Sequence, residues 1–474
     1  EDVDLSTAKN VKWVAKLGTQ SYGNPTISNG RIYIGTNNDS PRDSQHEGDR
    51  SIMLCLDEKT GEFIWQLVIP KLKSGKVNDW ESLGLLSSPT VVGNRIYVVT
   101  SRCEVLCLDT EGLANGNDGP YKDEAVYVHL DTGKPPAKIG KKDGDIIWRY
   151  DMMDELGVFP HNASNCSVIV VGDMVYACTS NGQDWTHSNV PSPLSPSFIA
   201  LDAKTGELLG EDDAGIGPNI YHGQWSSPSY GVVNGKGQLF FGGGDGWCYA
   251  FEPKPVYDED EDLDFLRKIW WYDSNPPEYK KDKNGKAIKY PAAEGPNEIN
   301  STPVFYKGRV YVAHGQDPEH GEGVGHLVCL DPSKKGEITK SGEIWSYKGI
   351  KRSISTVSID EDNGLLFVGD FSGFIHCLDA DTGKLHWVYD MKAHMWGSTL
   401  VADGKVYVGD EDGDFVVLAS DAKMKVLSET YFPAPIYSTP VVANGVLYVA
   451  TQSHLYAVYD EARAKSATDK KKAN

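Results

Sequence analysis

The sequence lacks the features that mark membrane proteins and several large classes of enzyme. It has no run of about 18 apolar residues, which excludes a membrane-spanning helix. It has no Cys-x-x-Cys pair, so neither a zinc knuckle nor attached c-type haem is indicated. A His-Glu-x-x-His motif, a nucleophile elbow and a Gly-rich phosphate loop are missing as well. These absences argue against conventional hydrolase and nucleotide chemistry.

Positive charge is also scarce. Lys and Arg number 46 against 67 Asp and Glu, and the formal net charge is −21. Nucleic-acid binding depends mainly on Lys and Arg that neutralise phosphates, so we expect no nucleic-acid partner. The only basic cluster lies at 465–474, and residues 461–474 are expected to form a disordered basic tail.

The eight cysteines do not indicate a disulfide framework. Five of them occupy equivalent places in the repeat described below and are expected to be small buried hydrophobes, far from one another: Cys55, Cys107, Cys248, Cys329 and Cys377. Two pairs are close enough in sequence to be tested for bridges, namely Cys103 with Cys107 and Cys166 with Cys178.

Helical periodicity is nearly absent, whereas one β motif recurs along the whole chain. It begins with a Ser/Thr-Pro step and a hairpin, as in "SSPTVVGNRIYVVT" at 87–100. A third strand ends in Leu-Asp, and a fourth ends in Trp, as in "FIHCLDADTGKLHW" at 374–387. A repeated unit of roughly 40–50 residues must stack on its neighbours to bury its apolar face. The motif therefore predicts a β-propeller.

Eight hairpin openings predict an all-β, eight-bladed propeller of four-stranded antiparallel blades over residues 1–460. The last unit ends at 453–460 without a fourth strand, and the segment 10–17 supplies a spare strand with Trp13 in the expected place. We expect this N-terminal strand to complete the last blade and close the ring, which hides both sheet edges at the seam.

Residues just before each first strand should line the channel on one face, because strand direction alternates within a blade. Leu86 and Ile354 belong to this ring, and its polar and aromatic members, with side chains just upstream, form the candidate binding site. The candidate residues are Tyr22, His161, Asn165, His222, Trp225, Glu298, Asn300, Arg352, His394, Trp396 and Tyr437.

The two longest loops between second and third strands, 181–197 and 314–326, should lie on the same face. The second loop carries a candidate transition-metal set: His314, Asp317, His320, Glu322 and His326. A hydrogen-bonded structural loop and a partner contact are the alternative interpretations.

Two insertions are expected on the opposite face. The segment 112–145 is interpreted as decoration with one weak strand. The acidic run 257–264 is expected to be a solvated loop, with calcium binding as the lesser alternative because an EF-hand's glycine and closing glutamate are missing.

The motif Leu-Asp-x-x-Thr-Gly-x-x-x-Trp, intact at 56–65 and 378–387, resembles the PQQ-like repeat. That repeat is shared by quinoprotein dehydrogenases and by non-enzymatic propellers such as BamB. Segments such as 315–332 and 369–380 also resemble uncharacterised PQQ-like propellers of planctomycete bacteria. The resemblance covers roughly 11–460. It implies the fold more than the function, because the motif residues hold blades together.

Two main classes of function follow, and a metal-assisted hydrolase that uses the His-rich loop 314–326 is a third, lesser alternative. The favoured one is a non-enzymatic binding or scaffold propeller that docks a protein, peptide or glycan at the channel mouth. The alternative is a PQQ- and calcium-dependent oxidoreductase acting on alcohols or sugars, with Trp225 or Trp396, Arg352, and Glu298 with Asn300 around the cofactor. The chain lacks the adjacent Cys-Cys pair of many such enzymes. We expect a periplasmic or otherwise exported protein, since the chain begins at Glu1 without Met, although a shortened chain would also fit.

Overall fold

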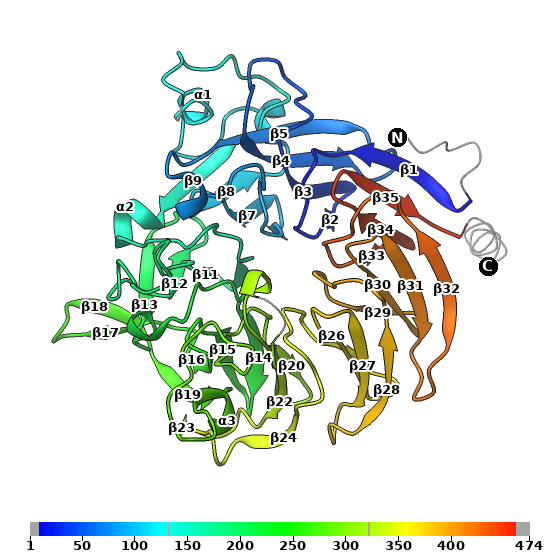
Figure 1. Cartoon of the computed structure of the whole chain (residues 1–474). Coiled ribbons are helices and arrows are strands. Elements are labelled where there is room, and N and C mark those ends of the chain that lie inside the picture. Colours follow the sequence, from blue (N-terminus) through cyan, green and yellow to red (C-terminus); the bar gives the residue numbers. More distant parts are fainter. Residues whose placement is uncertain (1–8, 131, 321–322, 461–474) are drawn as a thin grey trace.

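The computed structural model describes residues 9–130, 132–320 and 323–460 and forms a ring of eight blades around a central channel (Figure 1). The predicted fold is confirmed. The segment 461–474, expected to be a tail, lies outside the described residues.

The first four blades follow one another along the chain. Blade 1 contains β2 (Thr26–Ser28), β3 (Arg31–Asn37), β4 (Arg50–Asp57) and β5 (Phe63–Pro70). Blade 2 contains β6 (Thr90–Val92), β7 (Arg95–Val99), β8 (Glu104–Asp109) and β9 (Ile146–Asp151). Blade 3 contains β10 (Ile169–Val171), β11 (Met174–Cys178), β12 (Phe198–Asp202) and β13 (Leu208–Asp212). Blade 4 contains β14 (Ser229–Val233), β15 (Lys236–Gly242), β16 (Trp247–Phe251) and β19 (Lys268–Asp273).

The remaining blades complete the ring. Blade 5 contains β20 (Val304–Tyr306), β21 (Arg309–His314), β22 (His326–Leu330) and β24 (Glu343–Tyr347). Blade 6 contains β25 (Ser358–Asp360), β26 (Leu365–Gly369), β27 (Phe374–Asp379) and β28 (Leu385–Asp390). Blade 7 contains β29 (Leu400–Ala402), β30 (Lys405–Gly409), β31 (Asp414–Ala419) and β32 (Val426–Tyr431). Blade 8 contains β33 (Val441–Ala443), β34 (Val446–Ala450), β35 (His454–Val458) and β1 (Val11–Lys16).

The N-terminal strand closes the ring as predicted. β1 pairs antiparallel with β35, with Trp13 opposite Ala457 and Lys16 opposite His454. The Trp13 indole then reaches out of blade 8 and donates a hydrogen bond to the Glu58 carbonyl of blade 1, at 3.2 Å. The first and last described segments of the chain are thereby locked into one sheet.

Short helices occupy the connections between strands. They are α1 (Glu124–Tyr127), α2 (Met152–Leu156) and α3 (Pro277–Lys280), with 3-10 turns η1 (Gly75–Val77), η2 (Gly112–Ala114), η3 (Gly217–Asn219) and η4 (Pro318–His320). None of the described helices has the length and apolar character needed to cross a membrane.

The insertions differ from their sequence-based expectations. The segment 112–145 contains η2 and α1 where a weak strand was expected, because Tyr127 is buried and its hydroxyl donates to Glu104 Oε2 at 2.8 Å. The acidic run is a hairpin rather than a loop. Its strands β17 (Val256–Asp258) and β18 (Leu263–Leu266) extend blade 3, while β23 (Gly336–Glu337) extends blade 4.

The core lies between neighbouring blades. Apolar side chains of blade 2 pack on those of blade 3 in one buried cluster, and equivalent clusters join blades 4 and 5, 5 and 6, and 6 and 7. The repeat's indoles contribute to this packing: Trp65, Trp148 and Trp345 each donate to a carbonyl of the next blade, those of Thr110, Ala203 and Ala380, at 3.0–3.1 Å. All eight cysteines are buried free thiols.

A belt of hydrogen bonds runs around the channel through the Ser/Thr-Pro steps. In seven of the eight belt residues, all except Ser227, the backbone N–H donates to the side-chain oxygen of the equivalent residue in the next blade, at 2.8–3.1 Å, including the bond across the seam. The belt residues are Asn24, Ser88, Ser167, Ser227, Thr302, Thr356, Ser398 and Thr439. A short side-chain acceptor is therefore required there, which explains why the repeat opens with Ser or Thr.

Candidate functional site at the channel mouth

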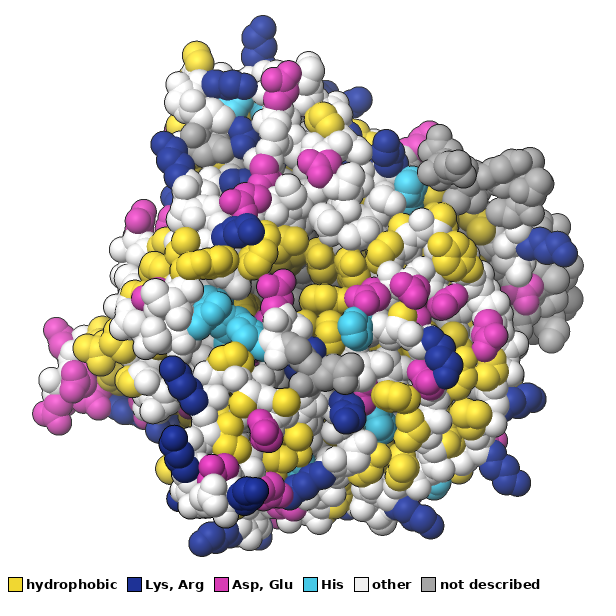
Figure 2. Space-filling view, viewed as in Figure 1, with side chains coloured by type: hydrophobic (Ala, Val, Ile, Leu, Met, Phe, Trp, Pro, Cys, Tyr) yellow, Lys and Arg dark blue, Asp and Glu magenta, His cyan; other side chains and the backbone are white. Residues whose placement is uncertain are grey.

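A cavity of about 410 Å³ opens at the channel mouth. Its wall includes the residues that lie two positions before belt residues in seven of the eight blades: Tyr22, Leu86, Asn165, Trp225, Asn300, Ile354 and Trp396. Loop residues complete the lining: Trp80, Leu83, Asn162, Ala163, Asp317, Pro318 and Glu319. Figure 2 shows hydrophobic side chains around the central hollow, with acidic and histidine side chains beside it.

The aromatic side of the mouth is held together by ring contacts and one carboxylate. Tyr22 stacks on Tyr437 with ring centroids 4.9 Å apart, and the Trp396 ring lies 5.5 Å from Tyr437. Glu411 accepts a hydrogen bond from Trp396 Nε1 at 3.0 Å and pairs with His394 Nδ1 at 2.7 Å. Tyr437 thus supports the wall without lining the cavity.

The polar groups of the cavity wall are mainly hydrogen-bond acceptors. Asn162 Oδ1 and Asn300 Oδ1 are buried and have no hydrogen-bond partner among the described residues. Asp317 and Glu319 add two carboxylates, whereas no Lys or Arg is among the described lining residues. The Trp225 indole N–H is already used, since it donates to the Ala163 carbonyl at 3.1 Å.

Six predicted mouth residues lie outside this lining: His161, His222, Glu298, Arg352, His394 and Tyr437. Arg352 is 2% exposed, and its guanidinium donates to the Asp317 carbonyl at 3.0 Å and lies 4.5 Å from the Phe371 ring centroid. Glu298 is fully buried and accepts from Asn300 Nδ2 at 3.2 Å. Burial raises the pKa of the Glu298 carboxyl well above its usual range, and the Asp317 carboxylate adds to that rise.

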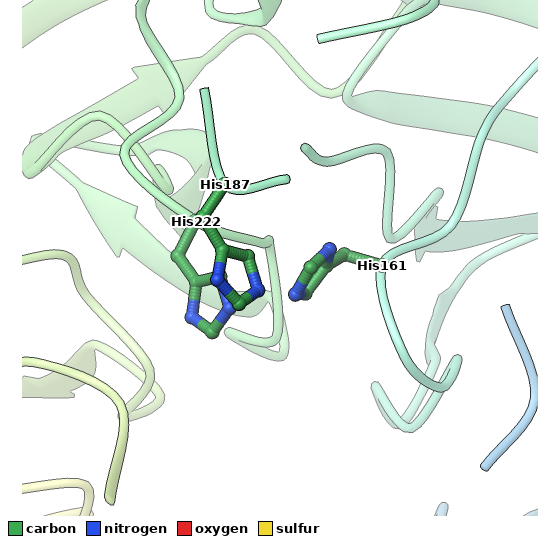
Figure 3. A group of neighbouring side chains, drawn as sticks. All are labelled: His161, His187 and His222. Carbon is green, nitrogen blue, oxygen red and sulfur yellow. The ribbon is translucent and has the colours of Figure 1, made fainter. Parts of the chain in front are cut away.

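A cluster of three imidazoles lies beside the cavity. His161, His187 and His222 come from three separate connections, after α2, between β11 and β12, and after η3, and their rings face one another (Figure 3). The ring centroids are 4.2 Å apart for His161 and His222, 4.8 Å for His187 and His222, and 5.1 Å for His161 and His187. One ring nitrogen from each lies within 4.8 Å of the others.

Two side chains of the 314–326 loop adjoin this cluster. His222, Asp317 and His320 also present ligand atoms within 4.8 Å of one another, and His320 Nδ1 lies 3.5 Å from Asp317 Oδ1. The His222 and His320 ring centroids are 4.6 Å apart. His222 therefore stands between two groups of donors.

The imidazoles of the cluster are disposed to be neutral. Burial lowers the pKa of His161 to about 4, although its hydrogen bond to a carbonyl opposes that shift. Burial also lowers the pKa of His222 and of His187, and neighbouring imidazoles lower both pKa values further.

The structure divides the metal set expected within the 314–326 loop. Asp317 and His320 join the channel-mouth histidines, whereas His314 and His326 lie elsewhere and both contact the Ser274 carbonyl, at 2.7 and 2.9 Å. Glu322 lies outside the described residues.

Sequence reasoning missed His187, Glu411 and the loop residues of the cavity wall other than Asp317, which are Trp80, Leu83, Asn162, Ala163, Pro318 and Glu319. The sequence does contain a signal for His187. Its loop, 181–197, is predicted to lie on the same face as the loop 314–326, and both loops contain histidine. Glu411 follows β30 and carries no local pattern that marks it as the partner of His394 and Trp396.

Comparison with known proteins agrees with the fold and with the repeat. A family model described as "Outer membrane protein assembly factor BamB" matches residues 13–251 and 340–425, more than half of the chain. The crystal structure of BamB from Moraxella catarrhalis superposes with a TM-score of 0.58 at 12% sequence identity, over 94% of this chain and 98% of that one. At this identity the structural likeness concerns the fold alone.

Curated relatives come from both branches of the repeat family. BamB of Nitrosomonas eutropha is 26% identical over 142 residues, covering 27% of this chain and 34% of that protein. The dehydrogenase subunit of the quinone alcohol dehydrogenase of Komagataeibacter europaeus is 24% identical over 445 residues, covering 84% of this chain and 53% of that protein. The chain thus spans about half, or less, of the length of these relatives. By its repeats, its blades and this match, the chain belongs to the PQQ-like β-propeller family whose model is described as BamB.

Proposed function

We propose that the chain is a non-enzymatic binding propeller of exported location that holds a basic segment of a partner protein at the channel mouth. The observation that carries the proposal is the cavity wall, which combines aromatic rings with acceptors and carboxylates and has no Lys or Arg among its described residues. A volume of about 410 Å³ is within the usual range for a specific binding pocket.

The aromatic rings supply the contact area. Trp80, Trp225 and Trp396 line the cavity, and Tyr22 adds a fourth ring. Buried tryptophan and tyrosine side chains commonly carry most of the affinity of a protein interface. Their faces also attract Lys and Arg side chains through the ring quadrupole.

The polar groups favour a cationic donor over a neutral ligand. The carboxylates of Asp317 and Glu319 accept hydrogen bonds and favour positive charge. Lys ammonium and Arg guanidinium groups have donors only, so they match this wall in both respects. The net charge of −21 would also steer a basic partner toward the protein. The family membership supports a protein partner, since the matching model describes an assembly factor.

The residues at the mouth do not fit PQQ. That cofactor is a planar polyanion, and no Lys or Arg among the described lining residues balances its charge, so only a bridging cation would hold it beside the carboxylates of Asp317 and Glu319. Arg352, expected to bind its carboxylates, is instead buried against Phe371 and the Asp317 carbonyl. No catalytic step is therefore assigned to a quinone at this site.

Binding of two fluorescein-labelled peptides tests the proposal. The first is Gly-Ser-Arg-Lys-Ser-Gly, and the second has Gln in place of both basic residues. We expect fluorescence anisotropy to detect saturable binding of the basic peptide only, weakening as salt is added. Glu319→Gln should weaken it about threefold to tenfold, and Trp396→Ala about thirtyfold.

Matched variants outside the cavity separate the site from the general charge of the protein. Glu261→Gln removes the same charge from the exposed β17–β18 hairpin, and Tyr431→Ala removes an exposed aromatic ring from β32, so both should bind like the parent. Equal binding of both peptides, or equal losses in Glu319→Gln and Glu261→Gln, would reject the proposal. Tighter binding of maltohexaose than of the peptide, or dye reduction after addition of PQQ and Ca²⁺, would replace it with the glycan or quinoprotein alternative.

A further inference from the structure

The imidazole cluster beside the cavity is assembled by the ring of blades and not by local sequence. His161 precedes blade 3, His187 lies in the β11–β12 loop of that blade, and His222 precedes blade 4. In Figure 3 the His161 ring approaches from one side, and the His187 and His222 rings lie together on the other. The three rings therefore surround one small space.

The spacing of the donor atoms suits one small cation. Imidazole nitrogens bind zinc at about 2.0–2.1 Å in a tetrahedral arrangement, so two ligands on one ion lie about 3.4 Å apart. The three ring nitrogens lie within 4.8 Å of one another without any ion. Side-chain movements of roughly 1 Å would bring them to bonding distance.

Four ring nitrogens of the cluster are buried and lack a hydrogen-bond partner among the described residues. Neither nitrogen of His222 has a hydrogen-bond partner among the described residues, and the same holds for His161 Nε2 and His187 Nε2. A buried polar atom without a partner costs about 1–3 kcal/mol. The rings meet in tilted and edge-to-face contacts, which do not satisfy these atoms, so packing alone does not explain the cluster.

His161 is also fixed in the form that a metal ligand needs. Its Nδ1 lies 2.5 Å from the Gln183 carbonyl oxygen, and a carbonyl only accepts, so the proton is on Nδ1. The lone pair is then on Nε2, which lacks a hydrogen-bond partner among the described residues. A backbone carbonyl on the far nitrogen is the usual outer partner of a metal-binding histidine.

We propose that His161, His187 and His222 bind one first-row transition-metal ion such as Zn²⁺, with Asp317 and His320 as the adjacent donors on its open side. Three imidazoles select such ions over Ca²⁺ and Mg²⁺, which prefer oxygen ligands. The site goes beyond the peptide-binding proposal and shares only Asp317 with it.

The pair His314 and His326 provides an internal comparison. Each ring contacts the Ser274 carbonyl, and their ring centroids are 5.2 Å apart. No third His, Cys, Asp or Glu joins them in a group that could hold an ion, within the described part of the chain. The two imidazoles that share the Ser274 carbonyl form a structural pair. The cluster instead has three imidazoles, with Asp317 and His320 beside them as further possible metal ligands.

Zinc binding by an untagged chain tests the site. The protein is stripped with EDTA, titrated with ZnCl₂ by calorimetry, and its metal content is measured after gel filtration. We expect about one zinc ion per chain for the parent. His187→Gln should lower the affinity by about 100-fold because it removes a direct ligand. Co²⁺ in place of zinc should give visible d–d absorption that this variant loses.

His394→Gln is the matched control, since it changes a histidine on the same face that lies outside the cluster and pairs with Glu411. It should bind zinc like the parent. Circular dichroism checks that each variant folds, and His222→Asn is the second ligand variant if His187→Gln does not. No stoichiometric zinc in the parent, unchanged affinity in a folded ligand variant, or an equal loss in His394→Gln would overturn the proposal.

Discussion

The chain's histidines have different roles because their ring nitrogens have different neighbours. His376 Nε2 lies 3.0 Å from Asp370 Oδ2, and His394 Nδ1 lies 2.7 Å from Glu411 Oε1, so both are held by carboxylates. His222 has no such partner among the described residues and is surrounded by other imidazoles. Residue type alone does not distinguish these cases.

Burial has an equally specific effect on one carboxyl group. Asp245 accepts hydrogen bonds from the Tyr249 hydroxyl at 2.7 Å and from the Trp247 N–H at 3.1 Å. These bonds lower its pKa, but burial outweighs them and raises the pKa of Asp245 to about 7 from its ordinary 3.8. The folded protein thus holds a proton that the unfolded chain releases at lower pH.

We predict that Asp245→Asn flattens the pH dependence of stability. Because the folded pKa is raised, the parent loses stability as pH rises from about 4 to about 7, by up to about 4 kcal/mol. The neutral amide has no proton to lose, so the variant should gain most over the parent at pH 8 and least at pH 5. Thermal melts across this range measure the difference. Asp260→Asn, at an exposed position, should follow the parent, and parallel curves for Asp245→Asn and the parent would contradict the prediction.

At the scale of the elements, four blades are fastened to the next by an indole that lies against a glycine turn, through Trp13, Trp65, Trp148 and Trp345. The Trp148 ring of blade 2 contacts Gly206, which lies between β12 and β13 of blade 3 at a φ of 77°. A Cβ at Gly206 would lie 2.5 Å from Trp148 Cε3. Gly235, in the Asn-Gly turn between β14 and β15, has a φ of 79° and no neighbour within 4 Å of such an atom.

These two glycines allow the contact between blades to be measured apart from backbone strain. Alanine at either position costs about 1–2 kcal/mol of folding stability, because the backbone there is left-handed. We predict that Gly206→Ala costs about 2–3 kcal/mol more than Gly235→Ala, because it also displaces the Trp148 ring. Urea unfolding of the two variants gives the difference. Equal losses would mean that the indole does not need the glycine.

For the whole molecule, stability depends on closure of the ring. β1 and the belt bond from Thr439 to Asn24, at 2.8 Å, both join the end of the chain to its beginning. Without β1, blade 8 would expose an unpaired edge, and blade 1 would lose the Trp13 indole that packs on Gly61.

We predict that deletion of residues 1–20 prevents a cooperative thermal transition at the parent's temperature. The point variant Trp13→Ala should cost about 3–5 kcal/mol, since Trp13 is 5% exposed. Tyr431→Ala is the control because Tyr431 is 68% exposed, and it should melt like the parent. A truncated chain with an unchanged transition would show that the seam contributes little.

Residues of the mouth wall could be predicted because they are tied to the repeat. Trp225 and Trp396 lie two positions before belt residues, so the alignment of blades places both around one opening. Glu411 and His187 could not be found in this way. Each lies in a loop whose path depends on contacts with other loops, as with the His187 ring against His222.

Blade number and ring closure follow from the chain alone, since alternating strands, hairpin turns and the fixed place of Trp are short-range patterns that each unit repeats. The convergence of His161, His187, His222 and His320 does not follow from any such pattern. These residues lie up to 159 positions apart along the chain, from 161 to 320, and they meet only after packing between blades has placed four connecting segments over one face. Local regularity encodes the scaffold, whereas contacts between loops create the cluster.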